Sequence, residues 1–180
     1  MASSNLTTVY LILTGDGMCM MHCISKILFG HELFSGIIRE KIRTELQIYK
    51  SWYMGEEQGV HAHDLQTPWL EEDYKEYLES TTPEQNAWSH IEHLQACANV
   101  LKRPICLFDN TEAGNMRAYT FLPLRINPAE CFKYPLALGW TSSHYNHFCA
   151  LCSNSQHESP MVRQLDQPDL YNVENYEQVQ

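Results

Sequence analysis

The sequence has few basic residues for its size. Its 180 residues include 12 Lys and Arg against 22 Asp and Glu, which gives a formal net charge of −10. Nucleic acids and anionic membrane surfaces are bound through basic patches. We therefore expect no nucleic acid and no membrane among the partners of this chain, and a partner whose surface is basic.

Long apolar runs are also missing. The longest uninterrupted aliphatic and aromatic run is Val9 to Leu13, whereas about 20 apolar residues are needed to span a bilayer. The N-terminus lacks the basic region that opens a secretory signal. Seven cysteines, an odd number without regular spacing, favour free thiols in a reducing compartment. These absences predict one soluble domain in the cytoplasm, and we expect it to be a monomer.

What is present is the composition of a folded globular protein, with 44% hydrophobic and 19% charged residues. Apolar residues at helical spacing predict helices over 20–29 and 32–49. Pro68 predicts a short helix over 69–78, because proline fits the first turn of a helix. The cap, proline and acid at Thr82–Gln85 predict a long helix that reaches Lys102.

Short apolar runs bounded by turn residues predict strands over 8–13, 105–108, 119–124, 136–140 and 148–152. Helices followed by a strand meander define an α+β fold. We predict a folded domain over residues 1–152 and a polar, loosely held tail over 153–180.

The sharpest local pattern is Gly15-Asp16-Gly17-Met18-Cys19, which runs directly into an amphipathic helix. Glycines permit a tight turn that leaves successive backbone N–H groups pointing outward. A cysteine at the first turn of a helix feels the positive end of the helix dipole, which favours its thiolate. The pattern thus predicts a nucleophile next to an oxyanion hole. A small buried hydrophobe after an ordinary turn is the alternative explanation of Cys19.

A nucleophilic cysteine needs a base, and neutral histidine is the usual one. Among the nine histidines, His144 and His147 lie in the turn before the last predicted strand, where catalytic groups often project. Surface histidines without a catalytic role would look the same in the sequence.

Other cysteine and histidine pairs do not make a convincing metal site. Cys149 and Cys152 have Cys-x-x-Cys spacing but lack the two further ligands of a structural zinc site. His93, on a predicted helix, is better explained as a packed and hydrogen-bonded side chain. We expect no metal and no cofactor.

Residues 15–19 resemble the Gly-Asp-Gly-Asn-Cys nucleophile motif of the ovarian-tumour (OTU) cysteine proteases at four of its five positions. Further segments resemble family motifs in the same order, and the resemblance spans roughly residues 9 to 152. It is strongest to the subgroup with Cezanne, Trabid and the valosin-containing-protein-interacting deubiquitinase. The segments are 93–105, 121–131, 134–140 and 146–151.

The resemblance implies a papain-like α+β fold, with helices packed on a small central mixed or antiparallel sheet. It also implies that Cys19 is the nucleophile, His147 the general base and Asp16 a residue of the loop that shapes the oxyanion hole. His144, with Asn146 two residues later, fits the pattern of the wider family and remains the alternative base.

Two departures from the family pattern bear on catalysis. Met18 stands where the family has asparagine, which removes a polar side chain from the loop but leaves its backbone donors. The third member of a triad is also not evident, and Asn146 or a backbone carbonyl are the candidates. Triads that lose a member keep a reduced rate.

By this resemblance the chain is a deubiquitinase that hydrolyses the isopeptide bond after the ubiquitin C-terminus, with ubiquitin or polyubiquitin as its partner. One alternative is an OTU domain that binds ubiquitin with weak or no cleavage. Another is a protease for a different ubiquitin-like modifier. A third, from a different class, is a redox- or metal-sensing module that uses the seven cysteines.

Overall fold

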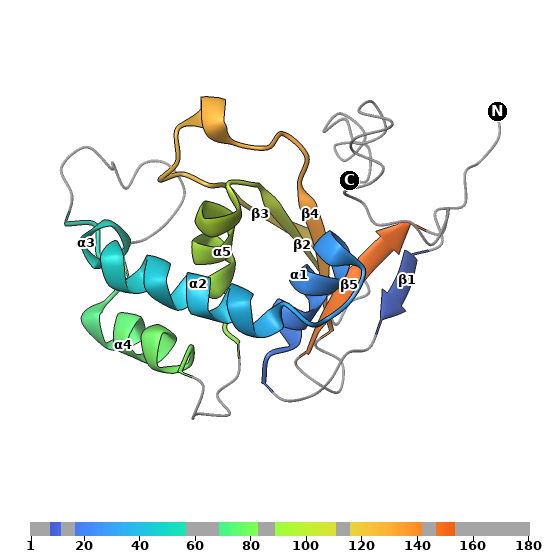
Figure 1. The fold of residues 1–180 in the computed structure, drawn as a ribbon, viewed down its shortest axis with the longest axis horizontal. Helices are drawn as coiled ribbons and strands as arrows, with labels where there is room; N and C mark the ends of the chain where they lie inside the picture. Colours follow the sequence, from blue (N-terminus) through green and yellow to red (C-terminus); the bar gives the residue numbers. More distant parts are fainter. Residues whose placement is uncertain are drawn as a thin grey trace.

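A computed structural model describes residues 8–11, 17–56, 69–82, 89–110, 116–141 and 147–153. Figure 1 shows the path of the chain through its helices and strands. In chain order these are β1 (Thr8–Leu11), α1 (Cys19–Phe29), α2 (Ser35–Ile48), α3 (Lys50–Tyr53), α4 (Glu71–Glu79), α5 (His93–Leu101), β2 (Ile105–Asn110), β3 (Met116–Phe121), the short 3-10 helix η1 (Pro128–Glu130), β4 (Leu136–Thr141) and β5 (His147–Ser153). Nearly all of the predicted tail lies outside the described residues, so the division into domain and tail stays a prediction.

The described strands form one five-stranded sheet in the order β1-β5-β4-β2-β3. Strands β2 and β4 are parallel, and the other neighbouring strands are antiparallel. The first strand pairs with the last, with Thr8 opposite Ser153 and Leu11 opposite Ala150. A mixed sheet with helices packed against it confirms the predicted α+β class.

The hydrophobic core lies between one face of this sheet and the helices. Side chains alternate between the faces of a strand, and the registers place the buried residues of three neighbouring strands on a single face. These residues are Ile105, Leu107, Leu136, Leu138, Phe148 and Ala150. Helix α1 lies in this core, in contact with β5 and α2. Nine of its side chains are buried, so α1 is a central helix with few solvated positions.

The predicted helix over 82–102 is wrong at residues 89–92, because α5 begins only at His93. Residues 83–88 of the prediction lie outside the described residues. The described residues just before α5 form hydrogen bonds that do not belong to a helix. The N–H and hydroxyl of Ser89 both donate to the carbonyl of Gly17, and the N–H of His90 donates to Nδ1 of His93. Its C-terminus is as predicted, since Lys102 takes the left-handed conformation that ends a helix.

The strand predicted over 119–124 lies three residues earlier, at Met116–Phe121. Two side chains of α5 hold the chain that follows it. The amide of Gln95 donates to the carbonyl of Leu122 over 2.7 Å, and the side-chain oxygen of Asn99 accepts from the N–H of Arg125 over 3.2 Å. The loop after Phe121 is therefore bonded to a helix instead of extending the sheet.

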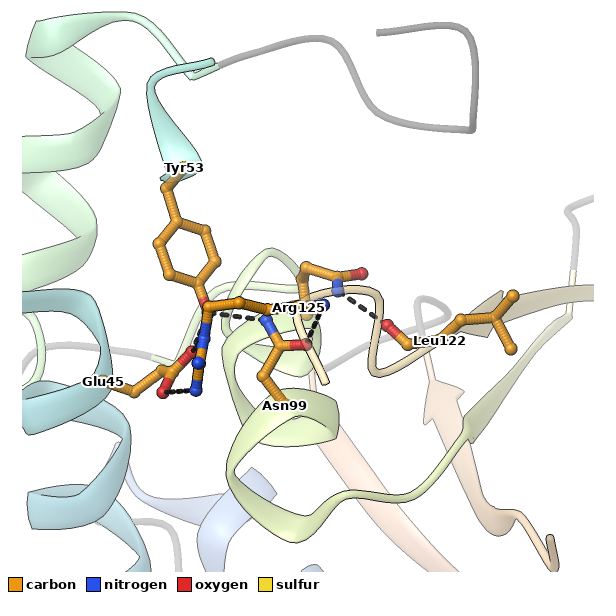
Figure 2. Close-up of polar contacts among 6 residues, drawn as sticks. Glu45, Tyr53, Asn99, Leu122 and Arg125 are labelled. Atoms are coloured by element: carbon orange, nitrogen blue, oxygen red, sulfur yellow. Dashed lines mark hydrogen bonds and ion pairs between the residues drawn. The ribbon is translucent and has the colours of Figure 1, made fainter. Parts of the chain in front are cut away.

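A buried polar network fixes the same loop to α2 and α3 (Figure 2). The guanidinium of Arg125 donates to both carboxylate oxygens of Glu45 over 2.7 Å each. The hydroxyl of Tyr53 donates to Glu45 over 3.0 Å, and the amide of Asn99 donates to that hydroxyl over 3.0 Å. The guanidinium also lies 3.5 Å from the ring centroid of Tyr49. The network thus connects four segments of the chain, namely α2, α3, α5 and the loop that carries Arg125.

His93 is a packed and hydrogen-bonded histidine, as predicted. Its ring is fully buried. Because Nδ1 accepts from the N–H of His90 over 2.9 Å, the ring proton is assigned to Nε2, which lies 2.8 Å from the carbonyl of Tyr77. Burial lowers the pKa of His93 to about 4, so the ring is neutral at pH 7.

Among the described residues, no helix combines the length and the apolar character that a membrane crossing requires.

Candidate active site

Cys19 is the first residue of α1, at the point where the chain enters the core. Gly17 has a φ of +82°, a left-handed conformation that glycine adopts easily. Met18 then sits at the N-cap position, and the helix begins with Cys19. The residue is only 3% exposed. Its thiol lies where the helix dipole favours a thiolate and where backbone N–H groups lack acceptors within the helix.

The turn before this helix is held from outside the motif by Ser89. The backbone N–H of Ser89 donates to the carbonyl of Gly17 over 3.1 Å, and its hydroxyl donates to the same oxygen over 3.0 Å. The hydroxyl also lies 3.3 Å from the sulfur of Met21. Ser89 therefore contacts both the turn and the helix that carries Cys19.

His147 is the first residue of β5 and is paired with Thr141 at the end of β4. The hydroxyl of Thr141 donates to the backbone carbonyl of His147 over 3.3 Å. The ring nitrogen Nε2 is buried, and the described part of the chain offers it no hydrogen-bond partner. Burial lowers the pKa of His147 below its ordinary value of 6.5. The imidazole is thus held in its neutral form, the form that accepts a proton.

Cys149, two residues along β5, is a buried thiol on the strand against which α1 packs. Burial raises the pKa of the Cys149 thiol to about 11, and the neighbouring thiol of Cys19 also raises it.

The strand register brings the start of α1, at Cys19, and the start of β5, at His147, to the same end of the sheet. Strand β1 runs antiparallel to β5, with Leu11 opposite Ala150. The chain therefore leaves β1 at the end where β5 begins and enters α1, which packs along β5. The predicted nucleophile and the predicted base are brought to the same edge by elements from opposite ends of the domain.

Three other predicted site residues lie outside the described ranges, namely Asp16, His144 and Asn146. Their roles stay predictions. Within the described ranges, no side chain forms a hydrogen bond to the ring of His147. The group that orients this ring is therefore also a matter of prediction.

The cysteines and histidines of the described ranges do not gather into a metal site. No group of three His, Cys, Asp or Glu side chains there is arranged to hold an ion. Cys149 of the Cys-x-x-Cys pair is a buried free thiol.

Ser89 is the residue near the nucleophile that the sequence did not reveal. Its partner, Gly17, is 72 residues away in the chain, and Ser89 fell within the wrongly predicted helix. No short-range pattern identifies such a contact.

A buried thiol at the start of a central helix, beside a strand that begins with a neutral histidine, is the arrangement of a papain-like cysteine protease. Residues 14–145 match the family described as OTU-like cysteine protease. The chain belongs to this family, as the resemblance of its motifs implied.

Two human proteins of known name are similar to this chain in sequence. The chain is 30% identical over 149 residues to "Deubiquitinating protein VCPIP1", a match that covers 76% of this chain and 12% of that protein. It is 28% identical over 163 residues to "Tumor necrosis factor alpha-induced protein 3", which covers 73% of this chain and 20% of that protein. The chain thus spans about an eighth to a fifth of the length of these relatives.

Solved OTU domains share the fold at low sequence identity. The OTUD1 OTU domain has a TM-score of 0.58 and 16% identity, with 81% of this chain and 86% of that chain covered. The Hazara virus OTU, solved bound to ubiquitin, has a TM-score of 0.54 and 15% identity, with 83% of each chain covered. These similarities confirm the predicted OTU-type fold.

Proposed function

We propose that this chain is a deubiquitinase that hydrolyses the isopeptide bond after the C-terminal glycine of ubiquitin. The observation that carries the proposal is the packing of α1, a buried helix with Cys19 at its N-terminus, against β5, where His147 has a buried ring nitrogen without a partner among the described residues. Membership of the family supports the chemistry. The relative named as a deubiquitinating protein and the OTU domain solved with ubiquitin support the substrate.

The proposed reaction has two halves that share one nucleophile. His147 takes the proton of the Cys19 thiol, and the thiolate attacks the carbonyl of the isopeptide bond, so that a carbon–sulfur bond forms. The tetrahedral oxyanion is held by backbone N–H groups of the 15–19 turn, a loop that Asp16 helps to shape. His147 protonates the leaving lysine amine as the carbon–nitrogen bond breaks. Water then attacks the thioester, gives a proton to His147 and releases ubiquitin with the regenerated thiolate.

The first test uses ubiquitin with an electrophile at its C-terminus. We expect wild type to form a covalent adduct of ubiquitin mass and Cys19→Ala to form none. A Cys131→Ser variant, which removes a more exposed free thiol, is the matched control and should react like wild type. Comparing His147→Ala with His144→Ala names the base, since the variant that lacks the base reacts more slowly.

Each other outcome points to a different function. A folded protein that forms no adduct but binds ubiquitin would be an OTU domain without cleavage. A protein that reacts only when the same electrophile is attached to another ubiquitin-like modifier would be a protease for that modifier. An adduct that persists in Cys19→Ala would overturn the assignment of the nucleophile.

A further inference from the structure

Ser89 holds the peptide group that precedes the nucleophile by two residues. Its N–H and its hydroxyl both donate to the carbonyl of Gly17, at 3.1 and 3.0 Å. A carbonyl oxygen has two lone pairs, so the two donors use its full capacity. Ser89 is 9% exposed, and water competes little for these bonds.

The consequence follows from the geometry of the peptide bond. In a planar trans peptide the C=O and the N–H point in opposite directions. Holding the carbonyl of Gly17 therefore directs the N–H of Met18 away from Ser89. Gly17, at a φ of +82°, has the conformational freedom to let this peptide group rotate. Ser89 opposes that rotation.

The same side chain is in contact with the helix itself. The Ser89 hydroxyl lies 3.3 Å from the sulfur of Met21, a residue of the first turn of α1 that is 2% exposed. The carbonyl is the stronger acceptor, so the hydroxyl proton goes to Gly17 and the thioether packs against the oxygen. Ser89 thus ties the orientation of the turn to the position of the helix that starts with Cys19.

We propose that Ser89 is a positioning residue for catalysis, which orients the backbone donors of the Gly17–Cys19 turn toward the oxyanion of the tetrahedral intermediate. The proposal rests on the proposed function for its substrate, but its chemistry applies to any acyl group that Cys19 attacks. An oxyanion donor must be aligned before the reaction to stabilise the charge that develops. The hydroxyl of Ser89 supplies part of that alignment.

The test separates reactions that form an oxyanion from one that does not. Hydrolysis of a ubiquitin C-terminal fluorogenic amide and acylation by p-nitrophenyl acetate both pass through a tetrahedral oxyanion. Alkylation of Cys19 by iodoacetamide is a direct displacement at carbon and forms none. In Ser89→Ala we expect kcat for the amide to fall by about 10- to 100-fold with little change in KM, somewhat less than the loss of a whole oxyanion donor. The rate of alkylation and its pH profile should stay within about twofold of wild type.

Two matched variants control for packing and stability. Ser80→Ala removes a buried serine hydroxyl that donates to the carbonyl of Tyr77 over 2.8 Å, and its kcat should match wild type. Ser89→Thr keeps the hydroxyl and should retain most of kcat even if Ser89→Ala folds poorly.

Several results would overturn the proposal. One is a kcat of Ser89→Ala that equals that of wild type. Another is a rate of alkylation that falls as much as the rate of hydrolysis. A third is a folded Ser89→Thr whose kcat is as low as that of Ser89→Ala. If wild type fails to cleave ubiquitin, the proposed function fails on its own. The ratio of p-nitrophenyl acetate acylation to alkylation then still decides the role of Ser89.

Discussion

The carboxylate of Glu45 should be among the most sensitive positions for stability. Its side chain is 6% exposed, and that of its partner Arg125 is 19% exposed. Glu45→Ala removes two charge-assisted bonds to Arg125 and one bond from Tyr53. It leaves a mostly buried cation without its counter-ion. Breaking a buried pair in this way costs about 3–5 kcal/mol, and the partial access of Arg125 to water places the expected loss near the lower end.

The assay is urea unfolding at pH 7, followed by tryptophan fluorescence. With a slope of about 2 kcal/mol per molar urea, a loss of about 3 kcal/mol lowers the midpoint by about 1.5 M. Glu45→Gln keeps one acceptor oxygen and loses only the charge, so its destabilisation should be clearly smaller. In the double variant Glu45→Ala/Arg125→Met the losses should be less than additive, with a coupling of about 1–3 kcal/mol.

An exposed ion pair of similar length provides the control. The Nζ of Lys102 lies 2.8 Å from a carboxylate oxygen of Glu130, but the two side chains are 46% and 57% exposed. Glu130→Ala should leave the midpoint unchanged, since exposed pairs contribute little. If Glu45→Ala destabilises no more than Glu130→Ala, burial of the network is not what makes Glu45 important, and the reasoning is refuted.

Three further predictions concern pH and packing. The acid limb of kcat/KM for ubiquitin amide hydrolysis should have its midpoint below pH 6.5, because burial lowers the pKa of His147 and keeps it neutral; a midpoint above 6.5 would contradict its role as base. The pKa of His93 is about 4 in the folded chain against 6.5 ordinarily, so the unfolded state binds more protons between these values. The free energy of unfolding should therefore fall by about 3 kcal/mol as the pH drops through that window, and denaturant titrations of His93→Gln should lack this component. In Gly139→Ala the new methyl would lie 2.7 Å from the sulfur of Cys149 and 3.1 Å from Leu151, which should destabilise the fold by about 1–3 kcal/mol in thermal unfolding. A second substitution, Cys149→Ala, should recover most of that loss, and purely additive losses would argue against the steric explanation.

The elements that the sequence predicted well are those whose pattern is local. The apolar runs that form β2, β4 and β5 are buried in the sheet, and Cys19 begins α1 two residues after Gly17, as expected. The start of α5 was mispredicted because Thr82–Gln85 is a good helix start by local rules. The backbone and hydroxyl of Ser89 bond instead to a turn 72 residues earlier in the chain.

The same distinction separates the parts of the site. Cys19 and His147 each lie in a recognisable local context, a glycine turn before a helix and a turn before a strand. Ser89 and the pair of Glu45 and Arg125, 80 residues apart, are defined only by tertiary contacts. A lone serine, glutamate or arginine has no sequence pattern that identifies its distant partner.

The pairing of the first strand with the last has a consequence for how this domain can be carried by other proteins. Thr8 and Ser153 are opposite one another in adjacent strands, where paired Cα atoms lie about 5 Å apart. A polypeptide that enters the domain at one of these residues leaves it beside the same point. Such a domain can be inserted into a longer chain, because the segments before and after it remain close together. The curated relatives devote only 12% and 20% of their length to the matching region, and this geometry suits a catalytic module that is inserted between other parts of a protein.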